Sequence, residues 1–96
     1  MANVAIYYQQ KEHEALEEAI KYVNMFIERI QSLHTIKGVF MDNCGERSRL
    51  TDLIDAPLSE IDCIYMEKPF NDEFDSQLIN QLSRSEKFEL KYFDEI

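Results

Sequence analysis

The stretch NVAIYY, residues 3–8, is the part of the sequence that decides the fold. It is apolar almost throughout and rich in β-branched and aromatic residues, which favour strands. A strand without polar alternation is typical of a parallel sheet whose two faces are both covered. The polar stretch QQKEHE, residues 9–14, then stands where the first strand of an α/β protein passes to its first helix. The beginning of the chain therefore predicts a parallel-sheet strand that is buried on both faces.

The residues after this strand have the period of a helix. Apolar side chains recur there every three or four positions, at Leu16, Ile20, Val23, Ile27, Ile30 and Leu33. This spacing is typical of an amphipathic helix whose apolar stripe faces the core. We therefore expect a helix within residues 11–34, with this stripe facing inward.

Three further strand patterns and two further helical patterns follow. The strands are expected at residues 35–42, 62–68 and 87–95, and the helices at residues 47–55 and 69–86. The expected inward residues are Leu50, Leu53 and Ile54 in the shorter helix and Phe74, Leu78, Ile79 and Leu82 in the longer one. The last strand alternates between apolar and polar residues, which is typical of a strand at the edge of a sheet.

Strands and helices thus alternate in the order βαβαβαβ along one domain, residues 1–96. Because crossover connections between parallel strands are right-handed, this order predicts a four-stranded parallel sheet flanked by helices in a three-layer α/β sandwich.

The composition excludes several classes of function. The formal net charge is −9, from 19 acidic and 10 basic residues. Such a surface repels phosphate backbones and anionic membranes, so we expect no direct nucleic-acid binding and no membrane contact. The start of the chain has no positively charged region before a long apolar run, which excludes a signal peptide and favours a cytoplasmic location.

Cysteine and histidine indicate no metal or cofactor. Cys44 stands in a turn and Cys63 in a strand, without the spacing of a zinc site. His13 and Glu17 are separated by one helical turn, but zinc needs at least three protein ligands. We therefore predict no metal and no cofactor, with Cys63 as a core residue and Cys44 as a small residue beside a turn glycine.

Three segments carry a further pattern. They are VAIYYQQKE (residues 4–12), FMDNCGERSRLTDLI (residues 40–54) and IDCIYMEKPFNDEFDSQLINQL (residues 61–82). The first resembles an apolar strand ending in a tyrosine–x–arginine–valine–serine motif. The second resembles a loop with an aspartate, a glycine and an arginine before a short leucine-rich helix, and the third a strand and helix with an aspartate–arginine–x–x–arginine motif. In this order the segments resemble the catalytic domain of the serine recombinases, the resolvase and invertase family.

The resemblance implies that the reactive groups of that family are lost. In the family a serine hydroxyl attacks the DNA phosphate and arginines stabilise the charge that develops. Position by position, Gln9 falls at the first arginine, Lys11 at the serine nucleophile and Arg47 at the retained arginine. The other degenerate positions are Asp42 in the loop and Phe70, Asn71 and Phe74 in the third segment. The resemblance therefore implies no catalytic residue and no enzyme, in a domain that lacks the long dimerisation helix and the DNA-binding domain.

The ends of the strands offer an alternative function. In open parallel sheets, ligands bind beyond the carboxyl ends of the strands. That rim is expected to hold Tyr8, Gln9, Gln10, Asp42, Asn43, Cys44, Gly45, Lys68, Asn71 and Asp94. Lys11, Arg47 and Lys68 could together receive a small anionic ligand or substrate. The plainer interpretation is that these residues are solvated loop ends.

The favoured prediction is an inactive resolvase-like domain that acts through protein contacts. The expected partner is an active recombinase, whose activity the domain would modulate, or a second copy of the chain. A third hypothesis is an acidic decoy that occupies a DNA-binding surface by charge mimicry.

Overall fold

A single four-stranded sheet organises the chain. The computed structural model describes residues 2–68, 70 and 72–95. The elements are β1 (Ala2–Gln9), α1 (Leu16–Ile30), β2 (His34–Asp42), α2 (Ser48–Asp55), the 3₁₀ turn η1 (Leu58–Glu60), β3 (Cys63–Met66), α3 (Glu73–Glu86), β4 (Glu89–Tyr92) and the 3₁₀ turn η2 (Phe93–Glu95). The sheet has the order β2-β1-β3-β4, and every neighbouring pair is parallel. The predicted fold class is confirmed.

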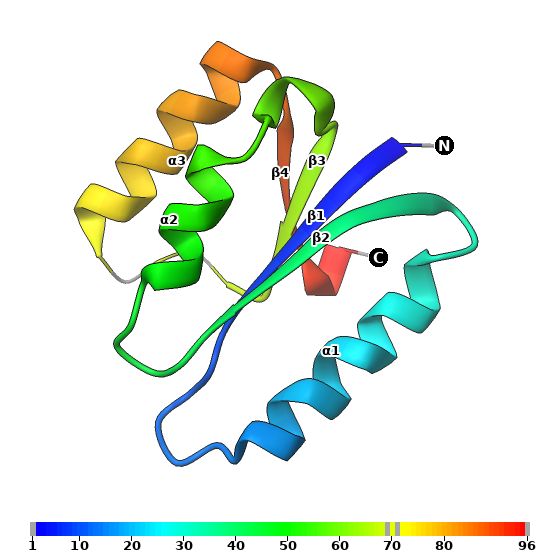
Figure 1. Ribbon diagram of the computed structural model, residues 1–96, viewed down its shortest axis with the longest axis vertical. Coiled ribbons are helices and arrows are strands. Elements are labelled where there is room, and N and C mark those ends of the chain that lie inside the picture. Colours follow the sequence, from blue (N-terminus) through cyan, green and yellow to red (C-terminus); the bar gives the residue numbers. More distant parts are fainter. Residues whose placement is uncertain (1, 69, 71, 96) are drawn as a thin grey trace.

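The first strand is buried on both faces, as its sequence indicates. Val4, Ile6 and Tyr8 belong to the core on one face of the sheet, whereas Ala5 and Tyr7 belong to the core on the other. All five are at most 3 % exposed. Figure 1 shows α1 on one side of the sheet and α2 and α3 on the other, so three layers form around β1.

The long helix is shorter than predicted and turns a different face to the core. It begins at Leu16 because the preceding loop is held in another conformation. His13 is in the left-handed region (φ 70°), and the Glu14 carboxylate accepts hydrogen bonds from the Lys11 backbone N–H and the Tyr8 hydroxyl. The buried side chains of α1 are Ala19, Val23, Phe26 and Ile30.

The prediction was therefore wrong for three residues of the stripe. Leu16, Ile20 and Leu33 are 56 %, 42 % and 61 % exposed. In α1, Phe26 stacks on Phe93 with ring centroids 4.0 Å apart and lies at the centre of the buried face, which leaves Leu16 and Ile20 to one side of it. Leu33 is exposed because α1 ends before it, at Ile30.

The opposite face follows the prediction except at Phe74. Leu50 and Leu53 of α2 and Ile79 of α3 are buried, and Ile54, Leu78 and Leu82 are partly buried. Phe74, expected to face inward, is 65 % exposed, and the next residue, Asp75, is only 8 % exposed. The helix begins at Glu73 with Asp72 as its N-cap, since the Asp72 side chain accepts a hydrogen bond from the Asp75 N–H. This start directs the Asp75 carboxylate inward.

The two edges of the sheet are different. β4 is an edge strand, as its alternation predicts, and is only four residues long. β2 forms the other edge with nine residues, and its register against β1 shifts at Lys37. In the part of the chain that the structure describes, no helix combines the length and the apolar character needed to cross a membrane.

Candidate functional site

A cavity of about 360 Å³ lies at the carboxyl ends of the strands, on the face covered by α2 and α3. We call it the strand-end cavity. Its lining residues are Tyr7, Gln9, Cys44, Gly45, Glu46, Arg47, Leu50, Phe70, Asp72 and Asp75. They come from β1, from the loop between β2 and α2, from α2 itself, and from the start of α3 with the residues before it. The place agrees with the expectation for a parallel sheet.

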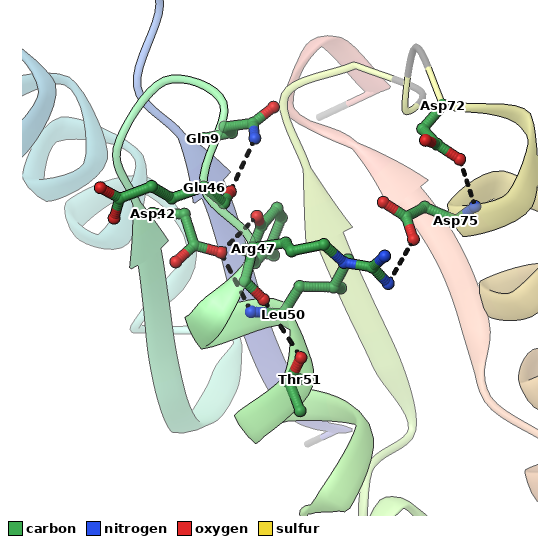
Figure 2. Close-up of polar contacts among 9 residues, drawn as sticks. Gln9, Asp42, Glu46, Arg47, Leu50, Thr51, Asp72 and Asp75 are labelled. Carbon is green, nitrogen blue, oxygen red and sulfur yellow. Dashed lines mark hydrogen bonds and ion pairs between the residues drawn. The ribbon is translucent and has the colours of Figure 1, made fainter.

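Asp42, at the end of β2, joins the sheet to the start of α2. Its carboxylate is 5 % exposed and accepts three hydrogen bonds: from the Tyr7 hydroxyl at 2.7 Å, the Arg49 N–H at 2.8 Å and the Leu50 N–H at 3.1 Å. The last two N–H groups belong to the first turn of α2 and have no partner within the helix. Asp42 therefore acts as a distant cap of α2, and Figure 2 shows it directed at Leu50.

The Tyr7 hydroxyl is held neutral by the same contact. Burial, followed by the hydrogen bond to Asp42, raises the pKa of Tyr7 well above its usual value. The hydroxyl therefore stays protonated at physiological pH and serves as a donor to Asp42 rather than as a base.

Arg47 reaches across the cavity to α3. One guanidinium nitrogen lies 2.5 Å from Asp75 Oδ1, and Figure 2 shows this ion pair spanning the space between the two helix starts. The Arg47 side chain is half exposed, whereas the Asp75 side chain is 9 % exposed. Because a buried carboxylate without a partner is costly, this ion pair is the contact that allows Asp75 to face inward.

The loop between β2 and α2 is held by backbone and side-chain contacts. The Gln9 amide donates to the Glu46 carbonyl at 2.9 Å, and Gly45 has φ +78°, a conformation that favours glycine. Cys44 stands next to Gly45 and is an exposed free thiol.

A second polar cluster lies at the strand ends on the face covered by α1. Lys11 Nζ is 2.6 Å from Glu67 Oε1 and 5.6 Å from the centre of the Tyr22 ring. The hydrogen bond to Glu67 raises the pKa of Lys11. The Tyr8 hydroxyl donates to Glu14 at 2.8 Å, and burial together with this bond raises the pKa of Tyr8.

The sequence prediction is only partly matched by these two clusters. Five of the predicted site and rim residues line the strand-end cavity, namely Gln9, Cys44, Gly45, Arg47 and Phe70. Asp42 lies behind its wall, hydrogen-bonded to Tyr7. The Phe74 side chain is exposed to solvent. Lys68 is also exposed and is not among the residues that line the strand-end cavity. Asn71 lies outside the described residues.

Tyr8 and Lys11 belong to the other face of the sheet, which corrects the expectation of one rim carrying three cations. A continued strand would direct Lys11 to the same face as Gln9. The chain instead turns at residues 11–14, where the Glu14 N–H donates to the Lys11 carbonyl, and the Lys11 ammonium reaches Glu67. Lys11 and Arg47 are thus separate, and each is paired with a carboxylate.

Sequence reasoning missed the residues that complete the cavity. Tyr7 could have been found from the alternation of β1, which directs it to the same face as Gln9. The inward position of Asp75 carries no local signal, because it depends on Arg47, which is distant in sequence.

The strand-end cavity is acidic rather than basic. Glu46, Asp72 and Asp75 line it against one guanidinium, that of Arg47. Its only lining residue that is a strong potential nucleophile, within the described part of the chain, is Cys44. Across residues 2–68, 70 and 72–95, no group of three or more His, Cys, Asp or Glu side chains is placed to hold a metal ion.

A different surface exposes large apolar side chains. We call it the α1–β2 flank and define it by Leu16, Ile20, Leu33 and Val39, which are 40–61 % exposed. Val39 pairs with Ile6 in the sheet and therefore faces the α1 side. Leu33 directly precedes β2.

The helix geometry assigns Leu16 and Ile20 to the same side of the molecule. At about 100° per residue they share one flank of α1, whereas Tyr22 and Met25 lie on the other. Tyr22 and Met25 line a hollow of about 290 Å³ together with Phe93, which follows β4. Since β4 and β2 are opposite edges of the sheet, Leu16 and Ile20 lie on the β2 side.

Comparison of the chain with protein-family models, with curated proteins and with solved structures finds no match. Its function is therefore inferred from its own residues.

Proposed function

We propose that this chain is a catalytically inactive, resolvase-like domain that acts by contacting another protein, and that a serine recombinase is the partner whose activity it modulates. The observation that carries the proposal is the α1–β2 flank, with Leu16, Ile20, Leu33 and Val39 all at least 40 % exposed. Apolar side chains that gather on one surface mark sites of protein interaction, because their burial against a partner removes them from water.

The pairing of Arg47 and Lys11 with carboxylates supports the proposed absence of catalysis. Phosphoryl transfer needs cationic groups that are free to stabilise the charge developing on the phosphate. Here Arg47 is paired with Asp75 and Lys11 with Glu67, on opposite faces of the sheet. No serine is among the described lining residues of the strand-end cavity.

The sequence resemblance supports the choice of partner. Gln9, Arg47 and Phe70, which the resemblance assigns to one degenerate site, line one cavity. Lys11, assigned to the nucleophile, does not, so this single equivalence gains no support. The position of Lys11 on the other face of the sheet counts against the inferred loss of a nucleophile at that residue, so the support that remains is the element order and the three residues that share the cavity.

The experiment measures binding and activity separately. The purified chain is titrated into a fluorescently labelled catalytic domain of a serine recombinase encoded nearby, and the recombination rate of the active enzyme is measured with and without it. We expect saturable binding, a changed rate, and no nicking of supercoiled DNA by the chain alone. Nicking by the native chain would contradict the inactivity. A lack of binding to the recombinase would contradict the proposed partner.

A matched pair of variants locates the contact. Ile20→Gln lies on the α1–β2 flank, and Met25→Gln lies on the opposite flank of the same helix, with exposures of 42 % and 57 %. Binding should weaken with the first variant and stay unchanged with the second.

A small anionic ligand is the second candidate function. One observation favours it: the half-exposed Arg47 guanidinium stands in a cavity of about 360 Å³. The acidic residues lining the same cavity oppose an anion. Thermal-shift measurements with nucleotides and phosphosugars test the hypothesis, and the absence of stabilisation by all of them would remove it.

A further inference from the structure

We infer that a second copy of this chain packs on the α1–β2 flank, with the two α1 helices antiparallel about a two-fold axis near Asn24. This inference rests on the proposed function, since it assigns a further partner to the same surface. A two-fold contact uses the same patch on both copies, so the patch must be complementary to itself.

The spacing of apolar residues along α1 has this property. With a two-fold axis at Asn24, a residue that comes a given number of positions before Asn24 lies opposite the partner's residue that comes the same number of positions after it. Ile20 then lies near the partner's Ile27, within one position, whereas Leu33 lies in the turn after α1 and is not placed by this register. Ile20, Asn24, Ile27 and Gln31 are spaced by four, three and four residues, which is the seam of a coiled-coil contact. Ile27 is partly buried and borders the core, so the seam continues the apolar surface of the domain.

The charges on the outer side of the seam fit the same arrangement. Lys21 and Glu28 are both exposed and each directly follows an apolar seam residue. The axis brings Lys21 close to the partner's Glu28, and the symmetry repeats this pair. Charges beside such a seam set the choice and orientation of the partner. Two copies of a chain of net charge −9 repel one another overall, so the two Lys21–Glu28 pairs at this surface act against that repulsion and favour this one orientation.

The edge of the sheet is less suited to self-association than the helix. The register of β2 against β1 passes from Val4–Ile36 to Ala5–Gly38, so Lys37 stands in an irregularity. Bulges and lysines on edge strands discourage pairing with another strand. The helix flank, and not the β2 edge, therefore carries the contact.

The size of the flank sets the strength of the dimer. α1 has 15 residues and is about 22 Å long, so one flank offers a few hundred Å², compared with about 800 Å² per partner in standard stable complexes. We expect a weak, reversible dimer with a dissociation constant on the order of 10 μM or higher.

Sedimentation equilibrium over a wide concentration range tests the association. The native chain should show a monomer–dimer equilibrium, and Ile20→Gln should weaken it about tenfold or more because the change occurs twice in each dimer. Met25→Gln should leave it unchanged. A native chain that stays monomeric, or an equal loss in both variants, would overturn the inference.

Charge reversal tests the antiparallel arrangement directly. Lys21→Glu alone and Glu28→Lys alone each place like charges opposite one another and should weaken the dimer about threefold to tenfold. An equimolar mixture of the two variants pairs opposite charges again and should associate like the native chain. Failure of the mixture to recover overturns the arrangement. The recombinase titration separates the two proposals: recombinase binding without self-association refutes only this inference, and self-association without recombinase binding refutes only the proposed partner.

Discussion

Replacement of Asp42 by alanine should be among the most destabilising changes of a polar residue in this domain. The carboxylate is 5 % exposed and accepts from the Tyr7 hydroxyl and from the N–H groups of Arg49 and Leu50. Alanine removes the acceptor and leaves these three donors without a hydrogen-bond partner. The Tyr7 ring is 3 % exposed and Leu50 is 1 % exposed, so water cannot readily replace the lost partner.

The magnitude follows from these groups. A buried donor without a partner costs about 1–3 kcal/mol, and loss of a helix cap costs about 1 kcal/mol. With the lower end of this range for each of the two buried donors and one cap, Asp42→Ala should lower the free energy of unfolding by about 3 kcal/mol, or roughly 12–24 °C in melting temperature. Asp42→Asn keeps one acceptor oxygen and should cost about half as much.

Urea denaturation followed by circular dichroism measures the change, and Asp52→Ala is its control. Asp52 is also a carboxylate that contacts Arg49, at 2.9 Å, but it is half exposed and should contribute less than about 0.5 kcal/mol. In a double-mutant cycle, Tyr7→Phe should reduce the cost of Asp42→Ala by about 1–2 kcal/mol, because no hydroxyl is then left without a partner. Equal costs for the two aspartates, or strict additivity with Tyr7→Phe, would refute the assignment of Asp42 as the link between β2 and α2.

Three further predictions concern the strand ends. Arg47→Met should lower the free energy of unfolding, measured in urea, by about 1–2 kcal/mol, because it leaves the Asp75 carboxylate buried without its cation. Adding Asp75→Asn should recover part of this loss, and a double variant that recovers nothing would contradict the pairing. Gly45→Ala should cost about 1 kcal/mol by the same measurement although its Cβ would meet no atom within 4 Å, since the cost lies in φ +78° alone, and Gly45→Asn should cost less. Because the pKa values of Tyr7 and Tyr8 are raised in the folded state, the folded state keeps both protons at a pH where the unfolded state loses them. These groups should not change the free energy of unfolding below about pH 10. Above that pH, the free energy of unfolding should fall by about 1.4 kcal/mol per pH unit for each tyrosine. Tyr8→Phe should halve that slope, and denaturation curves that do not change up to pH 11 would contradict the prediction.

The fold was predictable because its signal is local. β1 is apolar at consecutive positions, and each later strand is separated from the next by a helical period, so element order and right-handed crossovers lead to the observed sheet. The inward face of α1 was not predictable in the same way. Its choice depends on Phe93, which follows β4 and stacks on Phe26. A contact between such distant residues leaves no trace in the periodicity of the helix.

In the candidate site, too, the residues placed by local signals were predictable and those placed by distant contacts were not. Gln9 and Arg47 were placed together because each stands at a fixed distance from a strand or helix end. Lys11 was misplaced because the period of two residues holds only within a strand, and β1 ends at Gln9. Beyond that point Glu14 and Glu67 determine where the lysine lies.

Several polar residues at the strand ends pair with one another, and this pairing supports the proposal of a domain that acts through protein contacts. Groups arranged for an absent substrate are typically left without partners in the protein, because the reacting molecule completes their contacts. Here four pairs form at the strand ends, Tyr7–Asp42, Arg47–Asp75, Tyr8–Glu14 and Lys11–Glu67, although the buried Asp75 Oδ1 accepts no hydrogen bond from the described residues and is held by the ion pair alone. A phosphate that displaced Asp75 from Arg47 would leave this carboxylate buried with an uncompensated charge. The same pairs hold the loops at the strand ends in place and so fix the framework from which α1 presents its apolar flank. These pairs therefore support the proposal that the strand ends serve as a rigid support for a protein contact.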